Sequence, residues 1–576
     1  AFSQGSNWAL GWTGTSDLGH FVNASDSILT NLTGDDVDVM ASELVSFDSS
    51  LGVYVLNGSQ TLDSTKNYIL TDRLFVTDGN VLTIPAGTKI YNTTNDFGTA
   101  DKADDEFGSI VITRGSQIVA EGTAAAPIEF TTIRELEAER GMDMDSDSVA
   151  GLMPTKADRG LWGGLVILGN ARTYNYSAPG VLIGENVIEG FAPSVSPDAD
   201  NDGRADIIEY GGTNDEESSG ILTYVSIRHG GYEFETDNEI NGLTLGGVGS
   251  GTTLEYIEVM SNSDDGIEFF GGTANLKYAL VSFVKDDGFD LDEGYTGNIQ
   301  FACVIQTPTD TDSDDNSIQD SDHGGEWDGN VGGDTNDFQT APTIANITFI
   351  GDNEGDHAFK IDDFFAGSVY NGAVTSFADL VTVTGDAVLN DTASFTNVST
   401  DVSNALEADN VSVESVLAAQ FTDASSTGVG LNFVDVANAL YDPRPAADSV
   451  LLAANGAAVT DLSADSFFEV TDYQGAFSQG SNWALGWTGT DALGHFLQPD
   501  GDVIITSISK DGNNATIEFM SEASATYQIT YSDDLTSFAD TISGETGIPG
   551  TGGVVSRTFL IPDGTPEKLF FRVEEE

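Results

Sequence analysis

Residues 254–272, LEYIEVMSNSDDGIEFFGG, and residues 276–294, LKYALVSFVKDDGFDLDEG, carry one pattern twice, 22 residues apart. Each copy contains two short β-rich runs, and in each a glycine follows paired aspartates at the same corner. A fixed period of this kind is typical of stacked coils, in which each repeat buries its apolar face against its neighbours. The pattern therefore predicts a solenoid of β-strands.

The pattern extends into the neighbouring segments, where apolar residues alternate with period two, as β-strands require. One aromatic residue heads each of four equivalent strands: Tyr224, Tyr256, Tyr278 and Phe301. A second column of inward residues follows each turn: Leu243 and Leu245, Ile267 and Phe269, Phe289 and Leu291, Phe359 and Ile361. One turn per about 22–25 residues is the length of a three-strand coil of a parallel β-helix.

The chain is strongly acidic, with 93 aspartates and glutamates against 20 lysines and arginines and a formal net charge of −73. This balance argues against a nucleic-acid partner, because phosphate binding needs a basic surface. It also opposes acidic glycans unless cations bridge the charges. Solubility in salty water, where repulsion is screened over about 3–10 Å, accounts for most of the acids.

Cysteine content and hydropathy bear on where the protein works. The single cysteine, Cys303, rules out an intramolecular disulfide. No run of 18 apolar residues occurs, so we expect no membrane insertion. A composition rich in Asp, Asn, Thr and Gly but poor in lysine is typical of an exported protein. Ala1 begins within a motif, which suggests a mature chain whose export signal has been removed, and we expect a secreted or cell-surface location.

We predict an all-β chain in three parts. Residues 1–50 form an N-terminal segment, residues 51–496 a parallel β-helix with loop insertions and a C-terminal cap, and residues 497–576 a small antiparallel β-sandwich. The sandwich is indicated by short strand-like runs at turn-separated spacing after residue 500. Two polar insertions interrupt the coils at 134–160, with a helical start at Arg134, and at 308–340.

Several motifs resemble a family of exported, right-handed parallel β-helix proteins that is common in marine and other Gram-negative bacteria. They are LWGGLVILGN at 161–170, EINGLTLGGVG at 239–249, DDGIEFFGG at 264–272 and DDGFD at 286–290. The resemblance covers roughly residues 60–495 and implies the right-handed β-helix fold, but it brings no established activity. The tail KLFFRVEEE at 568–576 is similar to small C-terminal β-domains of exported proteins from Verrucomicrobia-like bacteria.

A second repeat joins the two ends of the chain. AFSQGSNWALGWTGT occupies residues 1–15 and returns unchanged at 476–490, and only two of 21 positions differ when the match is followed to residues 21 and 496. One interpretation is a duplicated cap, each copy covering an open end of the coil. The other is that both copies fit equivalent docking grooves, so that one docks on a neighbouring molecule and builds a filament. The anchors would be four tryptophans: Trp8, Trp12, Trp483 and Trp487.

The strongest metal motif is DADNDGRADIIE at 198–209, which matches a 12-residue calcium loop. Its ligands would be Asp198, Asp200, Asp202, the backbone carbonyl of Arg204, Asp206 and Glu209, with Gly203 at the sharp turn. The alternative is an acidic surface loop. Half of this pattern appears at Asp143, Asp145 and Asp147.

The repeat also stacks acids on neighbouring coils, Asp264 on Asp286 and Glu268 on Asp290. Coils lie about 4.8 Å apart, and like charges at that distance destabilise the fold unless a cation bridges them or a pKa rises. We take the coil that begins at His357 as the next match, with Lys360 in place of Asp290. His323 lies in the insertion at 308–340, from which it could overhang this column of stacked acids. The column is either a calcium-bridged ladder ended by a salt bridge or a polysaccharide-cleaving site.

The leading functional hypothesis is a calcium-stabilised extracellular or cell-surface structural protein that associates with itself, including into filaments. The alternative is a polysaccharide-binding or polysaccharide-cleaving β-helix enzyme that uses the acids near 264–293 and 356–363. We lean against a lyase or glycosidase, because no complete catalytic set is evident. Ca²⁺ is the expected cofactor, and further copies of the chain or surface glycans are the expected partners.

Overall fold

The computed structural model describes only parts of the chain. They are residues 29–32, 44–49, 51, 53–95, 106–140, 153–174, 186–189, 206–233, 240–307, 321–329, 339–353, 357–383, 393–402, 406–408, 420–497, 505–511, 514–521, 526–532, 540–550, 554–561 and 570–575. They divide into two compact units, one of residues 1–432 and 443–492 and the other of residues 433–442 and 493–576.

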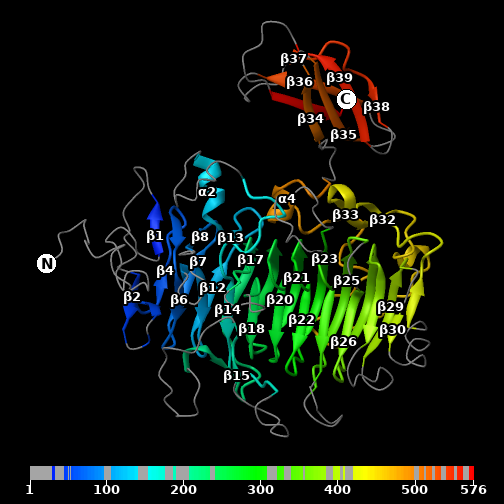
Figure 1. The fold of residues 1–576 in the computed structure, drawn as a ribbon. Coiled ribbons are helices and arrows are strands. Elements are labelled where there is room, and N and C mark those ends of the chain that lie inside the picture. Colours follow the sequence, from blue (N-terminus) through cyan, green and yellow to red (C-terminus); the bar gives the residue numbers. More distant parts are fainter. Residues whose placement is uncertain are drawn as a thin grey trace, which may run out of the picture. The chain divides into compact units, whose positions relative to one another are not determined.

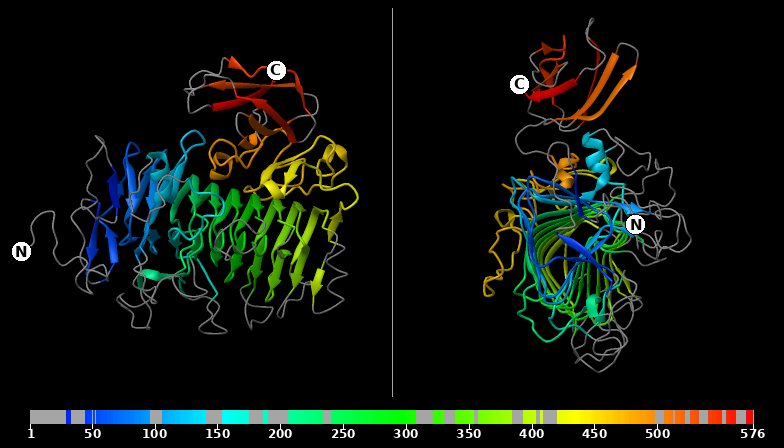
Figure 2. Two further views of the ribbon diagram at one scale, coloured as in Figure 1. Left: turned by 45° about the horizontal axis from the view of Figure 1, so that its top comes forward. Right: turned by 90° about the vertical axis from the view of Figure 1, so that its left-hand side faces the viewer.

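The first unit is a stack of parallel β-coils, as Figures 1 and 2 show. One wall of the stack, here called the first sheet, follows the order β1 (Leu29–Leu32), β5 (Asn67–Leu70), β8 (Lys89–Asn92), β13 (Ile128–Thr132), β17 (Gly220–Arg228), β19 (Thr253–Met260), β21 (Asn275–Ser282), β23 (Asn298–Ile305), β25 (Thr343–Ile350), β27 (Ser368–Thr375), β29 (Ser394–Thr400) and β31 (Phe421–Asp423). Three further strands, β4 (Gln60–Thr61), β7 (Val81–Pro85) and β12 (Gln117–Glu121), join it at β17.

The second sheet forms the opposite wall. Its order is β2 (Val45–Asp48), β3 (Val53–Leu56), β6 (Arg73–Val76), β11 (Ser109–Ile112), β14 (Leu165–Leu168), β18 (Leu243–Gly246), β20 (Ile267–Phe270), β22 (Phe289–Asp292), β24 (Gly325–Asp328), β26 (His357–Asp362), β28 (Asp379–Val383) and β30 (Leu406–Ala408). From β3 onward every pairing in this sheet is parallel. The predicted parallel β-helix is therefore confirmed.

The core is one continuous column of inward side chains between the two sheets. The predicted inward pairs Leu243/Leu245 and Ile267/Phe269 are fully buried, and their strands align residue by residue. The same core cluster runs from Val45 to Val398. Each coil thus buries its apolar face against the coil above and below, which is why the fold extends by repetition.

The aromatic residues predicted to head the strands lie instead at a bend inside them. Tyr224, Tyr256 and Tyr278 have φ of 49–57°, in the left-handed region that side chains other than glycine rarely adopt. Before this bend β17 pairs with β12, and after it β17 pairs with β13. The bend therefore replaces the turn that separates β12 from β13 in the earlier coils, and it forms the third corner of the expected three-strand coil.

The remaining elements are short. Helix α2 (Ile133–Arg140) confirms the helical start expected at Arg134. The others are β9 (Thr94–Asn95), β10 (Glu106–Phe107), β15 (Asn186–Val187), β16 (Glu209–Tyr210), β32 (Leu431–Asp435), β33 (Leu440–Pro445), the helix α4 (Gly489–Ala492), and the 3₁₀ helices η3 (Asp206–Ile208), η4 (Val436–Asn438) and η5 (Ala453–Asn455). None of the described helices is long and apolar enough to cross a membrane.

Residues 460–490, here called the strap, run along the outside of the first sheet. Asn371 holds Thr460 through two hydrogen bonds of 2.8 and 2.9 Å, and Asn346 donates to the backbone carbonyls of Tyr473 and Gly475. Farther along, the strap contacts β17, β19 and β21. The copy at 476–490 thus lies on the side of the coil, so the interpretation that it caps an open end is wrong.

The second unit contains an antiparallel sandwich, as predicted. One sheet joins β34 (Ile505–Asp511), β35 (Asn514–Met520) and β39 (Val554–Leu560), and the other joins β36 (Thr526–Ser532) to β37 (Asp540–Thr541), β38 (Ile548–Pro549) and β40 (Phe570–Glu575). Side chains of both sheets, including Ile517 and Ile529, form its separate core.

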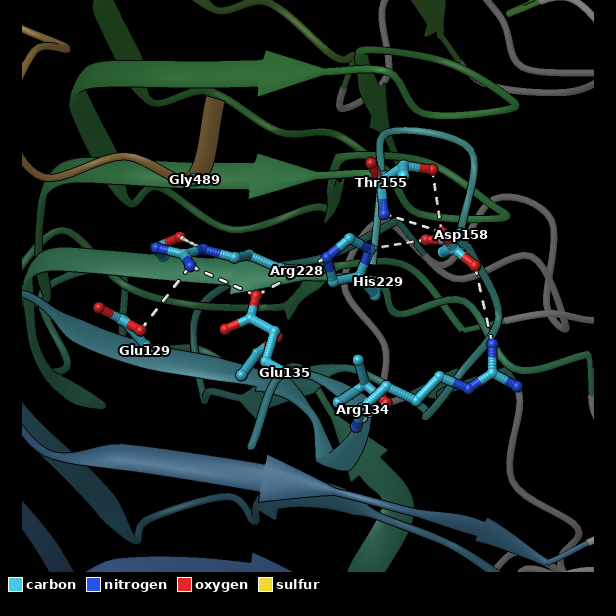
Figure 3. Close-up of polar contacts among 12 residues, drawn as sticks. Glu129, Arg134, Glu135, Thr155, Asp158, Arg228, His229 and Gly489 are labelled. Carbon is cyan, nitrogen blue, oxygen red and sulfur yellow. Dashed lines mark hydrogen bonds and ion pairs between the residues drawn. The ribbon is translucent and has the colours of Figure 1, made fainter. Parts of the chain in front are cut away.

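A buried ionic cluster ties α2 to the first sheet (Figure 3). The guanidinium of Arg228 lies 3.4 Å from Glu135, 3.7 Å from Glu129 and 3.9 Å from Glu258. Next to it, Nδ1 of His229 donates to the backbone carbonyl of Asp158 at 2.7 Å, and burial lowers the pKa of His229, so its ring is neutral. Arg228 therefore lies among three carboxylates that the fold withdraws from water, and Lys89 provides a second cation 2.9 Å from Glu129.

Replacing Arg228 with methionine will lower the free energy of unfolding by about 3–5 kcal/mol, because Glu135 and Glu258 stay buried and lose the guanidinium that compensates their charge. Chemical unfolding followed by circular dichroism measures this loss. Arg172→Met is the control, since the pair of Arg172 with Asp215 is more exposed and is worth about 0–1 kcal/mol. Equal losses in the two variants would contradict the role of the cluster.

Candidate functional site

A row of charged side chains crosses the outward face of the second sheet. Strands β20, β22, β24 and β26 lie side by side (Figure 1), and their register aligns Glu268 with Asp290, Asp290 with Glu326 and Glu326 with Lys360. These positions alternate with the inward core residues, as a strand requires. The predicted stacking of Glu268 on Asp290 is confirmed.

The expected order of the column needs one correction. Lys360 does not follow Asp290 directly, because β24 inserts a rung that carries Glu326 between them. His323 belongs to the residues that lead into this rung and does not overhang it. The sequence GEWD at 325–328 has Trp327 as its single large apolar residue, so its periodicity was too weak to indicate a strand.

The corner before these strands carries a ladder of hydrogen bonds. Oδ1 of Asp265 accepts the backbone N–H of Asp287 at 2.9 Å, and Oδ1 of Asp287 accepts the backbone N–H of His323 at 2.7 Å. The ring Nδ1 of His323 lies 2.9 Å from the same oxygen. Each corner carboxylate therefore binds the coil that follows, and all three residues are buried.

The acids in this region resist ionisation. Burial raises the pKa of Asp265, and the nearby Asp264 and Asp287 raise it further. Burial likewise raises the pKa of Asp290 well above its ordinary value, with added repulsion from Asp265 and Asp292. Stacked carboxylates in a poorly hydrated face must stay protonated or be neutralised by a cation.

The geometry fits a divalent cation. Carboxylate oxygens of Asp265, Glu268 and Asp290 lie within 4.8 Å of one another, and so do those of Asp264, Asp265 and Asp286. Oδ1 of Asp290 is buried and has no hydrogen-bond partner among the described residues. Oxygen ligands of this kind suit Ca²⁺. A third group, Asp287, Asp322 and His323, adds a ring nitrogen to the possible ligands.

A family model described as a pectate-lyase-like β-helix domain matches residues 54–142 and 152–442. The chain belongs to this family. A search of curated proteins found no match to its sequence. The family covers the coils that carry the acidic face, so the resemblance to parallel β-helix proteins inferred from the motifs is confirmed at that level.

In the pectate-lyase-like domain, the row of acidic side chains ends at a basic one, Lys360. Lys360 contacts Glu326 directly. Although burial opposes the charged form, this contact raises the pKa of Lys360 above its ordinary value. Lys360 is therefore a protonated partner of Glu326 and not a free base for proton abstraction.

The calcium loop predicted at 198–209 lies mostly outside the described residues, which include only Asp206 and Glu209 among its ligands. Asp206 begins η3, and Glu209 is buried on β16 with its Oε2 3.1 Å from Arg114. One oxygen of the expected bidentate ligand is thus bound by a guanidinium. The four other predicted ligands, Asp198, Asp200, Asp202 and the carbonyl of Arg204, lie outside the described residues, as do Asp143, Asp145 and Asp147.

Two buried or half-buried acids of this region are not indicated by the sequence. Glu293 is buried and accepts hydrogen bonds from Tyr210 and Asn186, each at 2.8 Å, and burial raises its pKa well above the ordinary value. Its partners lie 83 and 107 residues away, so no local signal pointed to them. Asp328 is the second outward residue of β24, and the sequence does not indicate it because it does not indicate this strand.

In the absence of divalent cations, the domain will become less stable as the pH rises from about 4 to about 8. Burial, with repulsion from Asp292 and Glu326, raises the pKa of Asp328 from 3.8 to about 8. A raised pKa means that the folded state prefers the neutral form of Asp328. The stability that this preference contributes is fully present below the pKa of the unfolded chain, and it is lost as the pH rises through the pKa of the folded protein.

Thermal unfolding in chelator across this pH range measures the effect. Asp328→Asn will make the decline smaller, whereas Asp461→Asn, at an exposed aspartate, will not. A melting temperature that stays constant or rises across the range in chelator would contradict the prediction.

Proposed function

We propose that the pectate-lyase-like domain binds a polysaccharide along the outward face of β20, β22, β24 and β26, with divalent cations bridging protein and glycan. The observation that carries this proposal is the cluster of Asp265, Glu268 and Asp290, whose carboxylate oxygens lie within 4.8 Å on a sheet face of the β-helix. Domains of this family often act on polysaccharides.

A bridging cation resolves an electrostatic conflict. The chain has a net charge of −73, so acidic sugars are repelled from it. A Ca²⁺ ion that shares its ligands between Asp290 and a sugar carboxylate or hydroxyl would turn the repulsion into attraction. Since Lys360 is already paired with Glu326, the bound Ca²⁺ ion and not the lysine supplies most of the positive charge that attracts the glycan.

The same geometry favours binding over cleavage. A lyase needs a base that is unprotonated near neutral pH, and a hydrolase needs one neutral and one ionised carboxyl at defined separation. Lys360 is held protonated, and the pKa values of Asp290, Asp287 and Glu268 are all raised. We therefore propose a glycan-binding domain in the first instance.

Asp290→Asn will lower the affinity for the bound polysaccharide at least about tenfold in millimolar Ca²⁺, because it removes a charged ligand of the bridging ion. Affinity electrophoresis against a panel of neutral and uronate-containing polysaccharides, with and without chelator, provides the measurement. Asp461→Asn is the control variant.

Retention that is unaffected by chelator and by Asp290→Asn would contradict the proposed site. Release of reducing ends or unsaturated sugars by the native protein, lost in Asp290→Asn or Lys360→Ala, would replace binding with catalysis as the function. No interaction with any member of the panel would leave the structural role as the better supported function.

A structural, self-associating role is the second candidate, and the docked strap favours it. Residues 476–490 are held against the β-helix, and the chain carries an identical segment at residues 1–15. Under this proposal the protein is exported to the cell surface or the medium, as in the marine and Gram-negative β-helix proteins that its motifs resemble. Its acidic surface suits such a setting, since high salt screens the repulsion between copies.

We also propose that the loop 198–209 binds Ca²⁺ and stabilises the fold. A ligand that binds only the folded state adds about 2.7 kcal/mol at a hundredfold excess over its Kd. Chelation will therefore lower the melting temperature of the native protein, and it will lower that of Asp200→Asn/Asp202→Asn less. If both proteins respond equally to chelation, the stabilising ion lies elsewhere.

A further inference from the structure

The last part of the strap docks on a surface made by the stacked tyrosines, here called the tyrosine face: Tyr224, Tyr256, Tyr278 and Glu258. Neighbouring rings of the three tyrosines stack in parallel at 4.3 Å. Trp487 meets Tyr224 edge-on at 5.4 Å, and Trp483 meets Tyr278 at 5.6 Å. Large aromatic side chains packed in this way dominate the energetics of interfaces.

Glu258 is the polar anchor of the tyrosine face. Its side chain is fully buried, and its carboxylate accepts the backbone N–H groups of Gly489 at 2.5 Å and Thr490 at 2.8 Å. The hydroxyl of Thr490 donates to it at 2.7 Å and contacts Ser282 at 2.7 Å. Any segment that covers Glu258 must supply donors in place of these three, because a carboxylate buried without them costs free energy.

The fit at residue 489 admits only glycine. A Cβ atom built on Gly489 would lie 2.5 Å from Nε of Arg228, and the ionic cluster of Arg228 with Glu129 and Glu135 holds that side chain in place. The tyrosine face therefore selects a Gly-Thr pair preceded by two tryptophans at defined spacing.

The docking segment is also organised within itself. The indole N–H of Trp483 donates to the carbonyl of Ala476 at 2.9 Å, that of Trp487 donates to Trp483 at 2.8 Å, and Phe477 stacks on Trp483 at 5.0 Å. These contacts join residues of one stretch, 476–490. A segment of the same sequence can therefore adopt the same shape without help from the rest of the strap.

Residues 1–15 repeat residues 476–490 at every position, so every group by which this segment meets the tyrosine face is present a second time. The hydrogen bond from Tyr278 to Glu469 lies outside the repeat. The equivalents of Trp483, Trp487, Gly489 and Thr490 are Trp8, Trp12, Gly14 and Thr15. The first differences, Ser16 and Asp17, correspond to Asp491 and Ala492, which lie beyond the residues that bind Glu258. Residues 1–28 lie outside the described residues, and the contacts given above are those of residues 476–490, which repeat residues 1–15.

We propose that the tyrosine face of one molecule binds residues 1–15 of a second copy in place of its own residues 476–490. Each chain carries one described face and two segments that fit it, so one segment per chain is in excess. Because donor and receiver differ, the association is head-to-tail and can continue from copy to copy. This inference gives the contact on which the self-associating candidate function rests, and it is independent of the glycan-binding proposal.

The exchange is governed by concentration. Residues 1–15 carry the same side chains as residues 476–490, so they can form the same hydrogen bonds and ring stacking with the tyrosine face. The tethered segment competes with them at an effective concentration of the order of millimolar. Association is therefore weak in dilute solution and strong where copies are crowded together.

Cysteine cross-linking tests the proposal on the full chain. Thr490 and Ser282 touch, so we place Thr15→Cys in one preparation and Ser282→Cys in another, mix them at high protein concentration and oxidise. The native Cys303 is fully buried and contributes little background. Adding Trp483→Ala and Trp487→Ala to the receiver weakens its own segment and will increase the yield of cross-linked dimer.

Two controls make the outcome decisive. Thr490→Cys with Ser282→Cys in one chain must give an intramolecular disulfide, which shows that this pair of positions can be bridged. Gly14→Ala in the donor will abolish the dimer, because its Cβ meets Arg228. A cross-link that forms only within a single Thr15→Cys/Ser282→Cys chain, or a Thr15→Cys donor that forms no cross-link at all, would overturn the proposal.

Discussion

The vertical register of the coils is the constraint on which the rest of the structure depends. Parallel strands about 4.8 Å apart bring each position of one coil directly over the same position of the next. Where that position is apolar, as at Leu243, Ile267 and Phe289, the register builds a continuous core. Where it is acidic, as at Glu268 and Asp290, the same register forces carboxylates together. Core and candidate cation site are consequences of one geometry.

The left-handed bend in the first sheet shows how a local backbone feature shapes a surface. The bend begins at Tyr224 and recurs at every described rung to Asn397, with aromatic side chains in the first four coils and asparagines in the last three. The aromatic half receives the tryptophans of the strap, and Asn346 and Asn371 bind its backbone through their amides. The strap thus follows a column that exists only because the coils stack.

The carboxylates of the first and the second sheet are stabilised in two different ways. In the first sheet, Arg228 compensates buried glutamates and leaves Glu258 able to receive the docked segment. In the second sheet the described cations are fewer than the acids, and burial together with repulsion from neighbouring carboxylates raises the pKa values of Asp290 and Asp328. The two proposals, self-association through the first sheet and cation-bridged glycan binding on the second, concern separate walls of one coil.

The sequence by itself determined the parallel β-helix, the inward columns, the stacking of Glu268 on Asp290 and the C-terminal sandwich. These follow from periodicity, which is a local property that repetition amplifies. It could not determine the rung at 325–328, whose single apolar anchor, Trp327, leaves no period to detect. Nor could it place Glu293 beside Tyr210, or the strap along Tyr256 and Glu258, since these contacts join segments that are distant in the chain. Tertiary structure decided them, because only the folded stack creates the buried surfaces that such distant groups must satisfy.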